Sequence, residues 1–183
     1  MATTTVQLAP LFQLEGASNF RSLEGVPTLD GRHIRANVLF RSDELSRLTY
    51  ADWAKLRDMR LIATCDLRRR DEREAYVAKV PADMTVHEYW WPYDDEMLAI
   101  MADMTAQIRA ALEPLASMDD ATLDAWVESR YAAYGSGFAK IAPHIRSVFE
   151  VVLKHGRDGA VLVHCAAGTC DTSLASAIAP TNH

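Results

Sequence analysis

The sequence has little of what marks several large classes of protein. Only three of its 183 residues are cysteines, too few for a disulfide framework. We therefore expect a reducing, cytoplasmic location, with export by an unconventional route left open. Apolar runs are too short to span a membrane, and the N-terminus lacks the apolar core of a signal peptide, so we expect no stable membrane insertion. The formal net charge is −6, with no basic run beyond Arg68–Arg70, which argues against a nucleic-acid partner.

The composition is that of an ordinary globular protein, with 49% hydrophobic residues. Its length predicts a single domain over residues 1–183 that is large enough for a real core. We expect residues 1–10 to form a loose tail. Residues 94–133 have a helical pattern and are interpreted as a helical insert or lid. The sequence does not indicate an oligomeric state.

Short apolar runs alternate with helical patterns along the chain. Strands are expected around residues 38–40, 61–67, 85–91 and 160–164. Helices are expected from the capping-box pattern Thr49-x-x-Asp52, over 71–78, and over 138–152, where apolar residues recur at helical spacing. The pattern predicts an α/β fold with a mostly parallel central sheet flanked by helices. Ligands of such sheets bind beyond the carboxyl ends of the strands, where Asp66 and Cys165 fall.

Residues 160–173 contain the sequence pattern that indicates a reactive site. The apolar run Ala160–Val163 leads into His164 and Cys165, then a small-residue loop with Gly168, and then residues typical of a helix start. Loop N–H groups and a helix N-terminus favour an anion, and the same field lowers the pKa of a cysteine. A thiolate nucleophile and a phosphate-binding loop can therefore be built from this one turn of backbone.

This stretch resembles the loop of the cysteine-dependent tyrosine phosphatases, above all the bacterial and fungal branch with His-Cys-x-x-Gly-Lys-Asp-Arg-Thr-Gly. Here His164, Cys165, Gly168 and Thr172 match. Three further segments are similar to motifs of that branch, in the same order and at similar spacing from about Phe12 to Thr172: Asn19–Gly25, Leu39–Ser46 and Cys65–Arg68 with Asp71–Arg73 after it. Together these motifs are specific, although each alone is weak.

The resemblance implies a tyrosine-phosphatase-like fold and a phosphomonoester hydrolase with a phosphocysteine intermediate. The substrate is expected to be a phosphorylated protein or a phosphoinositide, and no metal or other cofactor is implied. Cys165 is the expected nucleophile, Asp66 a candidate acid, and His164, Arg21, Arg41 and Arg68 supporting residues. The expected phosphate-binding loop consists of Ala166, Ala167, Gly168, Thr169, Cys170, Asp171 and Thr172.

The chain departs from the family pattern at the position of the loop arginine, which is Asp171 here. That arginine binds phosphoryl oxygens and stabilises the transition state, whereas a carboxylate repels phosphate. One charge at ~4 Å is worth about 4 kcal/mol at an effective dielectric of 20, and each ~1.4 kcal/mol is tenfold in rate. We therefore expect activity to be reduced at least ~10³-fold. Thr169 and Cys170 replace the family's lysine and aspartate, and we expect the family's C-terminal helices to be absent.

The residues leave several alternatives open. A catalytically dead pseudophosphatase, acting as a phospho-ligand-binding or interaction module, is the second functional hypothesis. A thiol redox site at Cys165 and Cys170 is a third. Asp66 suits a turn-capping carboxylate as well as an acid, and the supporting arginines suit salt bridges as well as phosphate contacts. Cys65, inside an apolar strand, is expected in the core.

Overall fold

The computed structural model describes residues 13–28, 31–93, 95, 98–99, 119 and 144–166. Within the chain, Pro92–His144 group as a unit apart from the remainder. The expected tail at 1–10 and the expected absence of C-terminal helices concern segments outside the described residues. The expected insert or lid at 94–133 lies outside them as well, apart from four single positions. These expectations therefore stay predictions.

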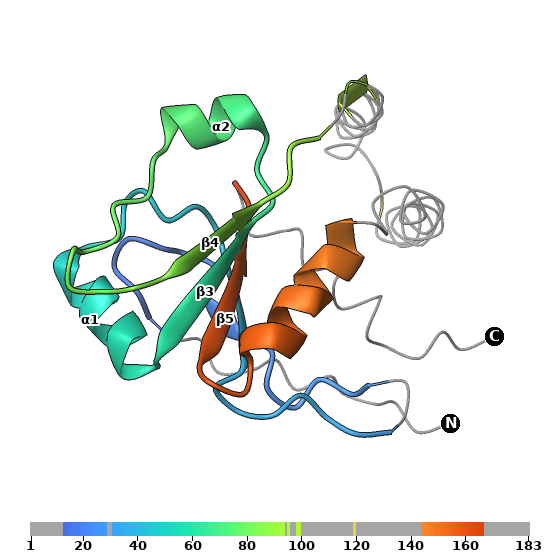
Figure 1. Cartoon of the computed structure of the whole chain (residues 1–183). Helices are drawn as coiled ribbons and strands as arrows, with labels where there is room; N and C mark the ends of the chain where they lie inside the picture. The colour runs from blue at the N-terminus through green and yellow to red at the C-terminus, as the bar shows by residue number, and fades with distance from the viewer. Residues whose placement is uncertain are drawn as a thin grey trace. The chain divides into compact units, whose positions relative to one another are not determined.

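A five-stranded sheet forms the centre of the described fold (Figure 1). Its strands are β1 (Arg21–Ser22), β2 (Leu39–Ser42), β3 (Leu61–Asp66), β4 (His87–Trp90) and β5 (Ala160–His164). The order across the sheet is β1-β2-β5-β3-β4. Only β1 pairs antiparallel, with β2, and the other pairs are parallel. The predicted mostly parallel α/β sheet is confirmed.

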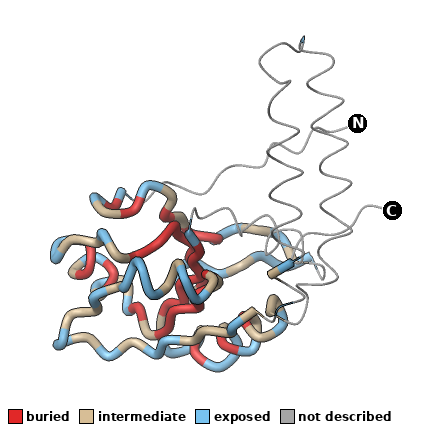
Figure 2. Tube along the Cα trace, turned by 90° about the horizontal axis from the view of Figure 1, so that it is seen from above, coloured by how far each residue is buried: buried red, intermediate tan, exposed pale blue. Residues whose placement is uncertain are grey.

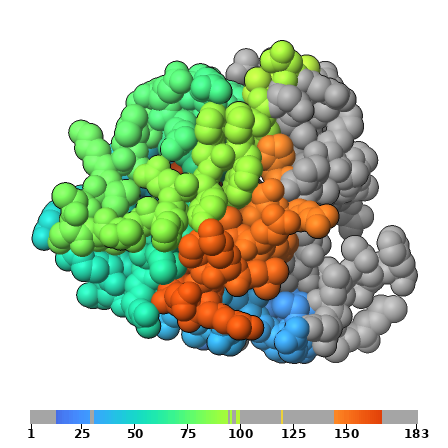
Figure 3. All heavy atoms as spheres, in the orientation of Figure 1, coloured from blue at the N-terminus to red at the C-terminus, as the bar shows by residue number. Residues whose placement is uncertain are grey.

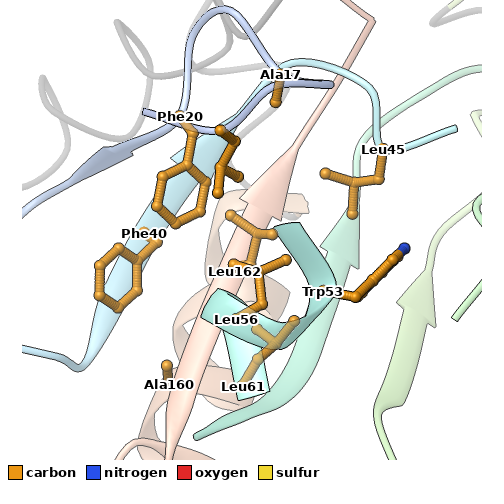
Figure 4. Packing of buried hydrophobic residues seen from close by; sticks show 10 residues of the cluster. Ala17, Phe20, Phe40, Leu45, Trp53, Leu56, Leu61, Ala160 and Leu162 are labelled. Carbon is orange, nitrogen blue, oxygen red and sulfur yellow. The ribbon is translucent and has the colours of Figure 1, made fainter. Parts of the chain in front are cut away.

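Helices cover both faces of the sheet, and the alternation of side chains along β5 shows why (Figure 1). Ala160 and Leu162 pack in a core that includes Trp53 and Leu56 of α1 (Tyr50–Asp58), as the close view in Figure 4 shows. Val161 and Val163 pack in a second core on the other face, with apolar residues of the helical segment 144–155. Residues that alternate along β5 thus serve two separate cores.

Burial is concentrated on the central strands (Figure 2). All residues of β2 and β5 are buried, whereas β4 at the sheet edge is exposed or half-buried. This agrees with the near-continuous apolar run that predicted β5, because a strand covered on both faces needs apolar residues at every position. Within the described residues, no helix is both long enough and apolar enough to cross a membrane.

The start of α1 is fixed by the predicted capping box. Thr49 Oγ1 accepts a hydrogen bond from the Asp52 backbone at 3.1 Å, and the Asp52 carboxylate accepts one from the Thr49 backbone at 3.0 Å. The same carboxylate also accepts from the N–H groups of Glu15 and Gly16, at 2.8 and 2.9 Å. Burial opposes ionisation of Asp52, but these hydrogen bonds lower its pKa overall. One buried carboxylate therefore ties the N-terminal segment to the helix.

A second carboxylate joins the N-terminal motif to β2. Asp43 accepts hydrogen bonds from the backbone and hydroxyl of Ser18, at 3.0 and 2.8 Å, and from the Asn19 backbone at 3.3 Å. Asp43 itself is buried. Two motifs that lie about twenty residues apart in the sequence are therefore in direct contact. They contain β1 and β2, which pair with each other, and β2 also pairs with β5.

Candidate active site

Cys165 lies directly after β5, between the ends of β2 and β3. Its backbone N–H donates to the Ser42 carbonyl at 3.4 Å, which continues the strand pairing by one residue. Asp66 and His164 are register partners at the same edge. Cys165 is buried. The structure therefore places the two candidate catalytic positions at the carboxyl edge of the sheet, where parallel-sheet proteins bind ligands.

Two arginines occupy neighbouring positions on the strands beside Cys165. Arg21 of β1 and Arg41 of β2 are register partners, and Arg41 is paired with Val163 of β5. Burial, and after it the charge of Arg21, lower the pKa of Arg41, while Cys165 acts in the opposite direction. A nearby anion stabilises a cation and so raises its pKa. The thiolate form of Cys165 is therefore within electrostatic reach of the Arg41 guanidinium.

Asp66 is held in a buried ion pair with Arg68. The Arg68 Nε and Nη2 atoms donate to the two carboxylate oxygens at 2.9 and 2.7 Å, and the Arg68 backbone N–H donates at 3.0 Å. The remaining guanidinium nitrogen donates to the Tyr76 carbonyl at 2.7 Å. Each guanidinium nitrogen of Arg68 thus donates to a protein group, and the salt-bridge interpretation fits Arg68 better than a phosphate contact.

The electrostatics of Asp66 also bear on its suggested role as an acid. Burial disfavours the charged carboxylate, but the Arg68 hydrogen bonds and nearby positive charge outweigh it and lower the pKa of Asp66. An acid must carry a proton at working pH. The lowered pKa favours the second interpretation of Asp66, a carboxylate that caps the turn after β3.

His164 is packed against the same ion pair. It is 4% exposed, and its Nδ1 lies 3.9 Å from Asp66 Oδ1. Burial lowers the pKa of His164 to about 4, although the Asp66 charge opposes that shift. The imidazole is therefore neutral at pH 7. Its Nδ1 has no hydrogen-bond partner among the described residues.

One residue of this edge, Arg73, was not given a site role from the sequence. Arg73 of α2 (Arg70–Ala75) lies 3.5 Å from Asp66 and 3.1 Å from Glu88. Its guanidinium also lies over the Trp90 ring, 5.0 Å from the centroid. The Asp71–Arg73 segment was part of the resemblance, but only the structure shows that the Arg73 side chain lies beside Asp66.

The remaining predicted residues fall into two groups, those that the structure describes and those that lie outside the described residues. Cys65 is a core residue, as expected, and burial raises the pKa of its thiol to about 12. Ala166 is exposed. Ala167, Gly168, Thr169, Cys170, Asp171 and Thr172 lie outside the described residues. Across the described part of the chain, His, Cys, Asp and Glu side chains form no group of three that could hold a metal ion.

Comparison with known proteins decides the family. The sequence matches the model of the tyrosine phosphatase family over residues 12–179. The chain belongs to the tyrosine phosphatase family. The match spans the N-terminal motif, the ion pair at Asp66 and the Cys165 segment. The search of curated proteins found no match to this sequence. One similar solved structure is a cysteine-to-serine variant of TpbA from P. aeruginosa in complex with pTyr. It is 15% identical, with 94% of this chain and 67% of that chain covered, at a TM-score of 0.43.

Proposed function

We propose that this tyrosine phosphatase family member is a phosphomonoester hydrolase with Cys165 as its nucleophile, and that its turnover is slow. The observation that carries the proposal is the position of Cys165 directly after the central strand β5. In the proposed reaction, the thiolate attacks phosphorus and forms a phosphocysteine while the alcohol leaves with a proton from an acid. Water then attacks phosphorus, which releases phosphate and the thiolate.

The positive charges near Cys165 favour an anion at the carboxyl edge of the sheet. Arg21 and Arg41 bring two positive charges to neighbouring positions, and a thiolate or a phosphate would reduce the repulsion between them. Cys65, the other described cysteine, is a poor alternative nucleophile because its thiol pKa is about 12. Of the two described thiols, Cys165 is therefore the one whose surroundings favour a reactive thiolate.

Slow turnover is proposed because of Asp171. A carboxylate at the position of the family's arginine repels phosphate and removes the bidentate contact to the transition state. The same change favours the alternative function, a pseudophosphatase that acts as a phospho-ligand-binding or interaction module. On either hypothesis the ligand is a phosphorylated protein or a phosphoinositide. We place the protein in the cytoplasm.

The test is hydrolysis of p-nitrophenyl phosphate by the wild-type chain and two variants. We expect wild-type turnover far below the ordinary enzyme rate of about 1 per second, and Asp171→Arg to raise kcat/KM at least about tenfold. Cys165→Ser should abolish hydrolysis in either background. Asp158→Arg is the matched control, because it makes the same change of charge at an exposed position away from Cys165 in the sequence, and it should leave the rate unchanged.

The outcomes separate the hypotheses. Ordinary turnover by the wild-type chain would refute the electrostatic argument about Asp171. Activity that survives Cys165→Ser would refute Cys165 as the nucleophile. No activity in either the wild type or Asp171→Arg, with phosphate or a phosphopeptide still bound, would favour the pseudophosphatase.

A further inference from the structure

Two positively charged side chains lie side by side on one face of the sheet. Arg21 of β1 is the register partner of Arg41, and Arg41 is the register partner of Val163. Register partners point to the same face of a sheet. Val163 packs in the core that the helical segment 144–155 covers, and this segment is orange in Figure 3. The two arginines therefore extend the row of Val163 across two further strands.

The Arg21 guanidinium is a half-buried cation without a counterion among the described residues. No ion pair or hydrogen bond links its side chain to any of them. Its Nε is enclosed by the protein, whereas the two terminal nitrogens remain accessible to a ligand. A buried charge is normally paired, and carboxylates are plentiful in a chain with 25 acidic and 19 basic residues. The missing counterion therefore points to an anion that a ligand supplies.

The place of Arg21 in the sheet indicates which anion it can bind. Arg41 lies within electrostatic reach of Cys165, and β1 lies beyond β2 in the order of the strands. Neighbouring strands are about 4.8 Å apart, so Arg21 lies about one strand spacing further from the nucleophile than Arg41 does. A phosphoryl group at Cys165 is therefore nearer to Arg41, and Arg21 is left for another anionic group of the same molecule.

We propose that Arg21 binds a second anionic group of the substrate, so that the preferred esters carry a carboxylate or phosphate besides the phosphoryl group that reacts. This inference rests on the proposed phosphatase function. A guanidinium donates charge-assisted hydrogen bonds to either group. The neighbouring Arg41 adds to the attraction, because both positive charges act on the same anion. Arg21 is thus a specificity-determining residue.

The test compares two esters that differ in one charge. In 4-carboxyphenyl phosphate a carboxylate replaces the neutral amide of 4-carbamoylphenyl phosphate, which has nearly the same size. Both are assayed with Asp171→Arg, which restores the family's loop arginine. In that background, Arg21→Gln should lower the ratio of kcat/KM for the carboxylate ester to that for the amide ester about tenfold, the value of one charge-assisted hydrogen bond. Any loss common to both esters cancels in this ratio.

Two further variants separate charge from other effects. Arg21→Lys keeps the positive charge and should recover most of the lost preference for the carboxylate ester. Arg35→Gln is the matched control, because Arg35 is exposed and precedes β2, whose other end lies beside Cys165. It should leave the ratio unchanged. An unchanged ratio in Arg21→Gln, or an equal fall in Arg35→Gln, would overturn the proposal.

A binding measurement separates this inference from the phosphatase function itself. If Asp171→Arg hydrolyses neither ester, the proposed function fails, and calorimetric titration then decides the role of Arg21. Asp171→Arg combined with Cys165→Ser should bind the carboxylate ester about tenfold more tightly than the amide ester, and Arg21→Gln should remove that difference. Equal affinities, or no binding of either ester, would overturn the role of Arg21.

Discussion

The Asp66 carboxylate accepts hydrogen bonds from both the Nε and the Nη2 atoms of Arg68, and each side chain is less than a tenth exposed. This ion pair stands at the carboxyl edge of the sheet, beside His164 and next to the loop that begins at Cys165. It gives the edge a fixed geometry, because Arg68 also holds the Tyr76 carbonyl beyond α2. We therefore propose that its main role is to position this part of the site.

The first prediction concerns the stability that this pair contributes. Asp66→Asn leaves Arg68 as a buried charge without its partner, which should lower the free energy of unfolding by about 3 kcal/mol. Urea unfolding measures the change. Asp71→Asn is the control, because Asp71 forms an exposed pair with Arg69 and should have little effect. A loss below about 1 kcal/mol in Asp66→Asn would contradict a structural role.

The pH dependence of the same pair has a definite sign. The pKa of Asp66 is lowered in the folded protein, so its carboxylate contributes stability above the pKa of the unfolded chain, about 3.9. That contribution is lost as the pH falls towards the lower native value. The difference in unfolding free energy between the wild type and Asp66→Asn should therefore stay constant, at about 3 kcal/mol, from pH 5 upwards. It should shrink below about pH 4.

A second prediction concerns the reactivity of Cys165. Without the family's loop arginine, its alkylation rate should rise with a midpoint near an ordinary thiol, about pH 8.5. Arg41→Gln should slow alkylation at pH 7 at least about threefold, because it removes the charge coupled to the thiolate. Arg41→Lys should restore the rate, which separates charge from packing. Cys170→Ser is used throughout, and Cys65 should not react in folded protein.

The exposed Arg35 provides the control for charge alone. Arg35→Gln should alkylate at the wild-type rate. If Arg41→Gln reacts as fast as the wild type, Arg41 does not act on the thiol. A midpoint below about pH 6 would contradict the prediction, because it would mean that the surroundings of Cys165 activate the thiol without the family's loop arginine.

At this edge of the sheet, the sequence predicted the positions of strands and helices better than the contacts between side chains. The bounds of β5 follow from one apolar run, and the start of α1 follows from Thr49 and Asp52, because both signals are local. The helix expected over 71–78 was observed as Arg70–Ala75 instead. Its end coincides with the hydrogen bond from Arg68 to Tyr76, a contact that depends on side-chain geometry and not on periodicity.

The electrostatics of the site could be predicted only in part. The edge positions of Asp66 and Cys165 follow from strand ends, but the pairing of Asp66 with His164 depends on the register of β3 and β5, which one sequence does not specify. The double contact of Asp52 to Glu15 and Gly16 spans more than thirty residues and has no local signal. The coupling between Arg41 and Cys165 likewise requires β2 to pair with β5.

A third prediction addresses the redox hypothesis. A disulfide between Cys165 and Cys170 needs Cα atoms within about 7 Å. We predict that the two thiols act independently. Mild peroxide followed by peptide mapping should therefore find sulfenic or higher acids on Cys165, because a resolving thiol within reach would capture the sulfenic acid first. A Cys165–Cys170 crosslink that forms in folded protein and reverses with dithiothreitol would instead establish a redox-gated site.

The most direct test of Cys165 as the nucleophile is to trap the phosphoenzyme. Asp171→Arg is mixed with ³²P-labelled phosphotyrosyl peptide, quenched within a single turnover, digested and mapped by mass spectrometry. The account predicts phosphate on the sulfur of Cys165, and none in the Asp171→Arg variant that also carries Cys165→Ser. Hydrolysis by Asp171→Arg with the label on another residue, or with the label undiminished in the Cys165→Ser background, would contradict it.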